Sequence, residues 1–161
     1  MYLALQVLTV MLAAVTMALS LAHALEFPGK LRLKKEQYLA VQPIYYPGFT
    51  IGGIAEPAVI LATLALLIVT PAGTAAFWLV AGALAALVTV QVIFWSKTQP
   101  VNSFWLEESE LSRSATRFFQ TGRGSAPRDW TAARDQWERS HIWRSLAATL
   151  GLFLLTIAVA L

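Results

Sequence analysis

Four long apolar stretches, separated by polar segments, set the pattern of this chain. A helix needs about 20 apolar residues to cross the hydrocarbon core of a bilayer. Each stretch approaches that length and carries almost no charge. The pattern therefore predicts four transmembrane helices, which cover approximately residues 2–25, 51–70, 75–96 and 141–161.

Proline, glycine and a capping residue mark the expected helix ends. Pro28 and Gly29 are expected to close the first helix, and Pro100 to end the third. A turn at 71–73 should join the second and third helices. Asp129 is a good N-cap for a helix that runs unbroken through the last span.

The segment 97–140 is longer than a simple connection requires. It has apolar residues at helical spacing on one face and acids and arginines on the other. The apolar face comprises Phe104, Leu111, Ala115 and Phe118. We therefore expect an all-α fold: one domain over 1–161, a four-helix transmembrane bundle with an interfacial amphipathic helix in its loop.

The composition agrees with a membrane protein. Of the 161 residues, 57% are hydrophobic and only 13% are charged, which is far more apolar than a soluble domain of this length needs. The chain has no cysteine, which excludes disulfides, thiolate metal sites and cysteine nucleophiles.

The placement of the charges predicts the orientation. All 12 lysines and arginines fall in or beside the first and third loops, which share one face of a four-span bundle. The positive-inside rule makes that face cytoplasmic, so loop 97–140 lies inside and both termini lie outside.

The first residues, MYLALQ, lack the basic start of a secretory signal, so we expect a retained span. A bacterial inner membrane is the expected location, and anionic lipid, not nucleic acid, is the expected partner of the basic surface.

Several polar side chains lie within or beside the expected spans. Such groups cost roughly 2.5–3.5 kcal/mol at the centre of a bilayer on insertion scales, so each needs a partner or a function. They are His23 and Glu26 in the first span, Glu56 in the second, Gln91 in the third, and a stripe of Trp130, Arg134, Trp137, His141 and Arg144 in the fourth. All of them lie toward the cytoplasmic side.

We interpret this convergence as a polar pocket that opens toward the cytoplasm. Its expected walls are His23, Glu26, Glu56, His141 and Arg144. The loop that contains Tyr45 and Tyr46 could fold over it. Each residue also has a simpler explanation: Arg144 could extend to the lipid headgroups, Glu56 could cap a helix or pair with a basic loop residue, and His23 could bond a backbone carbonyl.

The segment 137–144, WERSHIWR, carries the pattern W-x-x-x-H-x-x-R at the start of the last helix and follows Asn102 and Trp105. In this it resembles the anthrone-oxygenase-like family of small four-span membrane proteins. The segments 23–28 and 45–48 are similar to features of a bacterial subgroup.

The resemblance implies an oxidoreductase that oxygenates a hydrophobic aromatic substrate, an electron-rich polycyclic phenol, without a cofactor. His141 would be the catalytic base, and Arg144 would stabilise the oxyanion. Glu26 or Glu56 would orient a histidine. The implied substrate-binding residues are Trp137, Asn102, Tyr45, Tyr46 and Trp105.

Other functions remain open at this point. A metal such as iron, copper or zinc could be bound by four possible ligands, His23, Glu26, Glu56 and His141. The two histidines could instead ligate one b-type haem from opposite helices. The paired E-x-x-H motifs of di-iron bundles are missing. A non-enzymatic membrane subunit or small-molecule binder is the remaining alternative.

Overall fold

The computed structural model describes residues 2–105 and 129–161, with the backbone alone for 103–105. Within these residues the regular elements are all helices, and no strand occurs. Four helical segments are long and apolar enough to cross a membrane: Tyr2–Lys30, Gly48–Val69, Ala75–Asn102 and Trp130–Ala160. The predicted all-α class and the four long apolar helices are confirmed to this extent.

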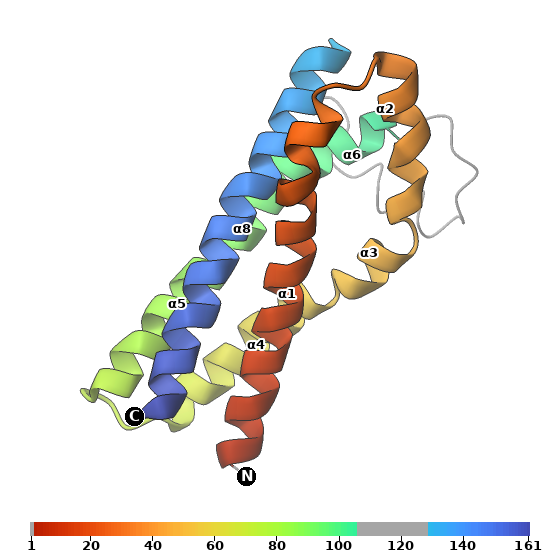
Figure 1. The fold of residues 1–161 in the computed structure, drawn as a ribbon. Coiled ribbons are helices and arrows are strands. Elements are labelled where there is room, and N and C mark those ends of the chain that lie inside the picture. The colour runs from red at the N-terminus through yellow and green to blue at the C-terminus, as the bar shows by residue number, and fades with distance from the viewer. Residues whose placement is uncertain (1, 106–128) are drawn as a thin grey trace.

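The long helices lie side by side, the short helices α2 and α6 lie toward one end, and α3 lies nearer the middle (Figure 1). Helix α1 packs against α4 and α8, and α5 packs against the same two helices, which closes a ring of four. Both termini lie at the end opposite α2 and α6. In chain order the elements are α1 (Tyr2–Lys30), α2 (Lys35–Val41), η1 (Gln42–Tyr45), α3 (Gly48–Gly52), α4 (Ala55–Val69), α5 (Ala75–Ile93), η2 (Phe94–Thr98), α6 (Gln99–Trp105) and α8 (Trp130–Ala160).

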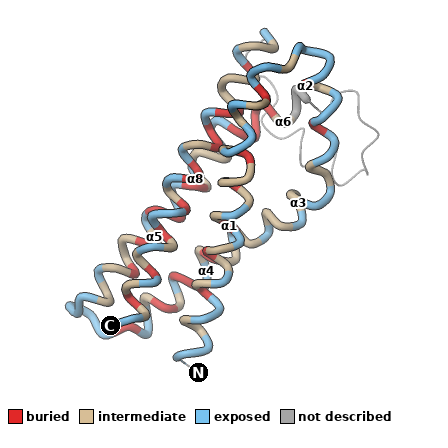
Figure 2. Tube along the Cα trace, viewed as in Figure 1, coloured by how far each residue is buried: buried red, intermediate tan, exposed pale blue. Residues whose placement is uncertain are grey.

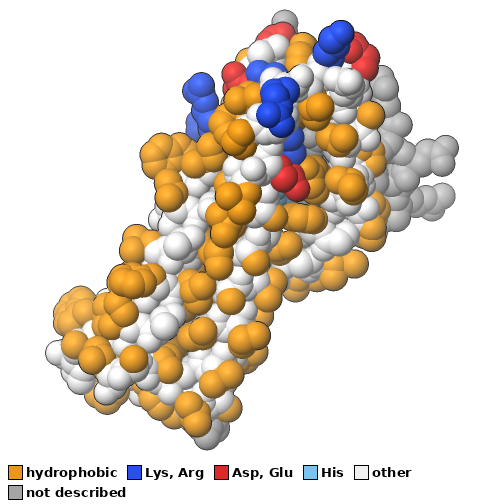
Figure 3. All heavy atoms as spheres, in the orientation of Figure 1, with side chains coloured by type: hydrophobic (Ala, Val, Ile, Leu, Met, Phe, Trp, Pro, Cys, Tyr) orange, Lys and Arg blue, Asp and Glu red, His pale blue; other side chains and the backbone are white. Residues whose placement is uncertain are grey.

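On the long helices burial follows the inward stripes, and their outer faces are exposed (Figure 2). Among the short helices, Tyr38 of α2 and Gln42 of η1 are also buried. The exposed residues include large apolar side chains such as Leu3, Leu61, Ile68, Trp78 and Phe153. Charged side chains gather at the end away from the termini, and the rest of the face shown is mostly apolar (Figure 3). The charge separation expected from the sequence is therefore present in three dimensions.

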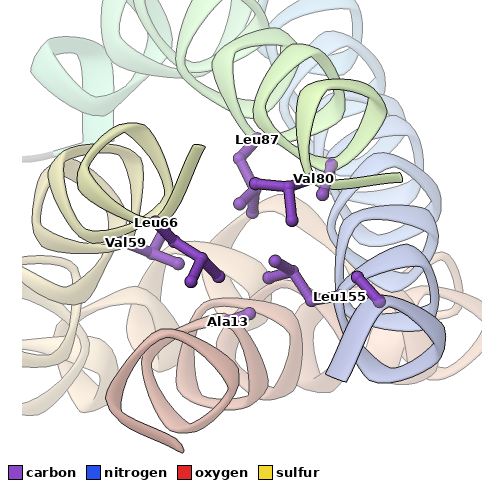
Figure 4. Packing of buried hydrophobic residues seen from close by; sticks show 8 residues of the cluster. Ala13, Val59, Leu66, Val80, Leu87 and Leu155 are labelled. Carbon is purple, nitrogen blue, oxygen red and sulfur yellow. The ribbon is translucent and has the colours of Figure 1, made fainter. Parts of the chain in front are cut away.

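The core consists of small and medium aliphatic side chains from all four long helices. Figure 4 shows Ala13, Val59, Leu66, Val80, Leu87 and Leu155 around the bundle axis. A Cβ added to Gly151 of α8 would lie 3.1 Å from Leu87 Cγ of α5. Glycine at this position therefore permits the close approach of these two helices.

The helix end predicted at Pro100 is wrong because the helix continues through the proline. The predicted close of the first helix at Pro28 and Gly29 is confirmed to within one residue. Helix α1 passes Pro28 and ends at Lys30. Proline there removes one backbone hydrogen bond near the helix end, and the last turn gains the ion pairs of Lys30 described below. Pro100 lies inside α6. The π-helical η2 precedes it, and Gln99 N–H bonds the carbonyl of Phe94, five residues back. This wider turn accommodates a residue that cannot donate.

Other boundary predictions are confirmed. The Asp129 carboxylate accepts a hydrogen bond from the Ala132 amide at 3.0 Å, and α8 then runs unbroken to Ala160. The turn at 71–73 joins α4 to α5, with Gly73 at φ 82°. The predicted interfacial helix, which would contain Leu111 and Phe118, lies outside the described residues.

Candidate functional site

A cavity of about 560 Å³ lies at the charged end of the ring of helices. Its walls come from α1, α4, α5, η2, α6 and α8, and from the η1–α3 segment. This volume is within the range of about 300–1,000 Å³ that is typical of small-molecule sites. Aromatic and aliphatic side chains form most of the wall, and a few polar groups converge on it: His23, Glu56, Gln91, Asn102, His141 and Arg144.

The two histidines of the chain meet in this cavity. His23 comes from α1 and His141 from α8, and their ring centres are 4.2 Å apart. Both are buried, with 5% and 3% of their surface exposed. The indole of Trp137, one turn before His141, packs 4.2 Å from His141 and 4.9 Å from His23. The convergence expected from the sequence is thus realised by three rings from two helices.

The backbone fixes the tautomer of His141. Its Nδ1 lies 2.9 Å from the carbonyl oxygen of Trp137. A carbonyl oxygen only accepts hydrogen bonds, so Nδ1 carries the hydrogen. In the neutral ring the lone pair is then on Nε2. His141 is therefore arranged as a proton acceptor through Nε2.

Glu56 and Arg144 form a buried ion pair between α4 and α8. The Arg144 guanidinium donates to one carboxylate oxygen of Glu56, and the Gln91 side chain donates to the other at 2.8 Å. The guanidinium also lies 5.1 Å from the ring centre of Phe94. Arg144 thus points inward instead of extending to headgroups, and the partner of Glu56 is an arginine of α8, not a residue of the basic loop.

Aromatic residues of the η1–α3 segment cover the histidine pair. Tyr45 lies 4.4 Å and Phe49 4.6 Å from the His23 ring, and the two aromatic rings are 5.2 Å apart. Tyr46 also lines the cavity. The Tyr45 hydroxyl donates to Glu26 at 2.5 Å. The expected loop over the pocket is therefore present as two short helices.

The remaining predicted site residues, Asn102, Trp105 and Glu26, differ in how they lie relative to the cavity. Asn102 lines the cavity and accepts a hydrogen bond from Trp137 Nε1 at 2.8 Å, so it orients the indole. Its own amide nitrogen donates to Gln99. The side chain of Trp105 lies outside the described part of the chain. Glu26 is at the margin: its Oε2 is 4.0 Å from His23 Nδ1 and its side chain is 43% exposed.

Sequence reasoning missed a second polar network, which lies just beyond the cavity. The ammonium of buried Lys30 lies 2.9 Å from Glu26 and 3.5 Å from Glu138. The Tyr38 hydroxyl donates to Glu138 at 2.8 Å, and both residues have no exposed surface. Lys30 also lies over the rings of Tyr45 and Trp137, at 4.7 and 4.9 Å from their centres.

The amino-acid sequence gives little indication of this network. Lys30 and Glu138 both appear in polar segments, where charges are ordinarily solvated. Glu138 does lie three residues before His141, on a neighbouring helical position. The network joins α1, α2 and α8, and it attaches the short helices to the bundle.

The two tyrosines of these networks have altered acidity. Burial raises the pKa of Tyr38 well above its ordinary value, and the nearby Glu138 carboxylate raises it further. Burial also raises the pKa of Tyr45, and the hydrogen bond to Glu26 adds to this. Both phenols are therefore donors over the whole physiological pH range.

The geometry gives little support to the metal and haem alternatives. Both oxygens of Glu56 already accept hydrogen bonds, and Glu26 is bound to Lys30 and Tyr45. Within residues 2–105 and 129–161 no three ligating side chains are arranged around one point. Two axial ligands at roughly 2 Å from iron would hold the ring nitrogens about 4 Å apart and the ring centres farther. The rings of His23 and His141 instead pack directly on each other, with no space for a porphyrin.

Comparisons with protein families, with curated proteins and with solved structures found no significant match to this chain. The proposals below therefore rest on the residues of this chain and on the motif resemblance of segment 137–144.

Proposed function

We propose that this chain is an integral membrane protein whose charged end faces the cytoplasm and whose termini lie outside. The four long apolar helices and the apolar side chains on their outer faces support insertion. The concentration of lysine and arginine at one end supports the orientation (Figure 3). The cavity would then lie near the inner leaflet.

Within this frame we propose an enzyme that oxygenates a hydrophobic aromatic compound. The observation that carries the proposal is the arrangement of His141, whose Nδ1–H is held by the Trp137 carbonyl while the residue lines a largely apolar cavity. The base acts through Nε2 on a ring CH₂ that is acidified by a neighbouring carbonyl. The resemblance of segment 137–144 to the anthrone-oxygenase-like family supports the same chemistry.

The reaction balances with dioxygen as the only co-reactant. His141 takes one proton from the ring CH₂, and the resulting anion is delocalised over the aromatic system. The anion adds dioxygen to give a carbon-bound peroxide. Loss of the second hydrogen of that carbon and cleavage of the O–O bond leave a carbonyl, and one oxygen atom departs as water. The substrate carbon is oxidised and dioxygen is reduced.

Arg144 and Trp137 have supporting roles in this proposal. Arg144 lines the cavity, and its buried Nε has no acceptor among the described residues. An oxygen atom of the substrate can supply that acceptor, and its developing negative charge would be stabilised there. The indole of Trp137 is fixed by Asn102 and offers a flat face for stacking.

A second candidate function is binding without chemistry. It is favoured by the pairing of Glu56 with Arg144 and of Glu26 with Lys30, since these charges are already neutralised without a ligand. In this case the polar groups would join helices, and the cavity would hold a hydrophobic molecule for another protein.

Anthrone and dioxygen test the two candidates in one preparation. The purified protein in lipid nanodiscs is mixed with anthrone, and oxygen consumption and the spectrum of the carbonyl product are followed. We expect turnover that falls about a hundredfold or more in His141→Ala, since general bases contribute on this scale. Trp143→Phe is the matched control, because Trp143 is on the same helix and exposed. Saturable anthrone binding without oxygen consumption would favour the binder, and turnover that survives His141→Ala would contradict the assigned base.

A further inference from the structure

The cavity is not sealed on all sides. Four of its lining residues are also exposed at the molecular surface, Pro57 among them. The other three are Ile51 at 63%, Ile54 at 65% and Trp95 at 48%. Ile51 belongs to α3, Ile54 to the turn between α3 and α4, and Trp95 to η2. These three residues form what we call the rim. The cavity therefore reaches the surface between the α3–α4 segment and η2.

The opposite end of the cavity, toward the charged end of the molecule, is closed. Behind His23, the rings of Tyr45 and Trp137 are 6.1 Å apart, and the Lys30 ammonium lies over both. Glu138 and Tyr38 complete this layer and are fully buried. A ligand arriving along the bundle axis would have to break a buried ion network, so the rim is the easier route.

The surface around the rim is suited to lipid. Both sides of the rim belong to helical segments that are long and apolar enough to span a membrane, Gly48–Val69 and Ala75–Asn102. Residues 44–96, which contain the whole rim, include one charged side chain, Glu56. Glu56 faces inward to Arg144. A water-facing opening ordinarily has charged or strongly polar residues around it, and the exposed side chains of this rim are two isoleucines and a tryptophan.

We propose that the cavity opens sideways into the bilayer through the rim, and that its ligand is a lipid-dissolved ring compound with an apolar chain. The ring and its oxygen lie at the closed end, near the histidine pair and Arg144, and the chain extends past Ile51 and Ile54 into the lipid. This inference rests on the proposed membrane insertion and names the substrate class of the proposed site. It does not depend on whether the bound compound reacts.

Spin-label accessibility tests the lateral opening. The chain contains no cysteine, so each single-cysteine variant carries one label. Labels at Ile51→Cys and Ile54→Cys in nanodiscs are compared with two references: Ile68→Cys on the exposed apolar face of α4, and Lys34→Cys in the exposed basic loop. We expect both rim labels to collide with oxygen as often as the Ile68 label and to be protected from a water-soluble nickel chelate. Rim labels that match Lys34 instead would overturn the lateral opening, whatever the enzyme assay shows.

Ligand binding tests the substrate class. The probes are 2-naphthol and the same ring with a dodecyl chain, both added to nanodiscs at matched concentration in the lipid, with binding followed by quenching of tryptophan fluorescence. We expect the alkylated probe to bind about tenfold tighter, which corresponds to roughly 1.4 kcal/mol. Ile54→Trp, which narrows the rim, should weaken or slow binding of that probe, and Ile68→Trp should not.

The outcomes separate this inference from the proposed chemistry. Equal binding of the two probes, or equal effects of the two tryptophan variants, would contradict the chain-bearing ligand while leaving the role of His141 intact. Tight binding of the alkylated probe with no oxygen consumption would support the rim and contradict the oxygenase.

Discussion

Arg144 of α8 donates a hydrogen bond to Glu56 of α4 inside the bundle, so one buried ion pair joins two helices that are not neighbours in the sequence. Gln91 of α5 bonds the same carboxylate. Three of the four long helices are therefore connected through Glu56. This arrangement fixes the polar wall of the cavity before any ligand binds.

Removing one member of this pair should destabilise the protein strongly. Glu56→Ala leaves a buried guanidinium without its counter-ion, and such changes cost about 3–5 kcal/mol. We expect a large fall in the thermal midpoint in detergent. The double variant Glu56→Leu with Arg144→Met should recover most of the loss, because no charge is then left unpaired. A single variant as stable as the unmodified protein would show that the pair does not form.

Nitrogen NMR can read the tautomer of His141 directly. In protein labelled with ¹⁵N on histidine, we expect the hydrogen on Nδ1 of the neutral ring, since this atom donates to the Trp137 carbonyl. The signals that disappear in His141→Gln belong to His141, and those that disappear in His23→Gln belong to His23. A hydrogen on Nε2 of the neutral ring would remove the proposed base.

A spectroscopic titration should show that two of the four tyrosines, Tyr38 and Tyr45, lose their hydroxyl protons only at a pH well above 10.0. We call this part of the titration the late phase. Burial raises the pKa of Tyr38 and Tyr45 above the ordinary value of 10.0, so the folded protein holds these protons more tightly than the unfolded chain. The contribution of these two phenols to the free energy of unfolding is therefore fully present below pH 10.0. It is lost as the pH rises above 10.0, because the unfolded chain then releases protons that the folded protein still holds. The ultraviolet phenolate band should therefore grow in two phases. Tyr38→Phe and Tyr45→Phe should each shrink the late phase, and a late phase that neither changes would contradict the assignment.

Maleimide labelling of intact cells should establish the orientation. Ala72→Cys lies in the exposed turn between α4 and α5, and Lys34→Cys lies in the exposed segment after α1. We expect a membrane-impermeant reagent to modify Ala72→Cys in intact bacteria and Lys34→Cys only after permeabilisation. The reverse pattern would place the cavity toward the outer leaflet, and labelling of both sites in intact cells would contradict the membrane-spanning arrangement.

The long apolar helices and the meeting of the two histidines could be expected from the sequence, because both follow from local pattern. A run of apolar residues predicts a long helix wherever it occurs. His23 lies near the C-terminal end of α1 and His141 in the N-terminal half of α8. Because these two helices are antiparallel, packing brings both rings to the same depth in the bundle.

The second polar network could not be predicted in the same way. Tyr38 and Glu138 are 100 residues apart in the chain, and their hydrogen bond depends on where α2 folds back onto α8. The passage of the helix through Pro100 has a similar origin. It depends on the π-helical turn at η2, which no local propensity indicates.

The short turn at 71–73 gives the α4–α5 pair the form of a hairpin whose closed end lies far from the cavity. The two sides of the rim are attached to the free ends of that hairpin, whereas the histidines are on α1 and α8. The hydrogen bond from Gln91 to Glu56 joins these free ends just inside the rim. The width of the entrance is therefore set by a polar contact between α4 and α5, and the packed imidazoles have no part in it.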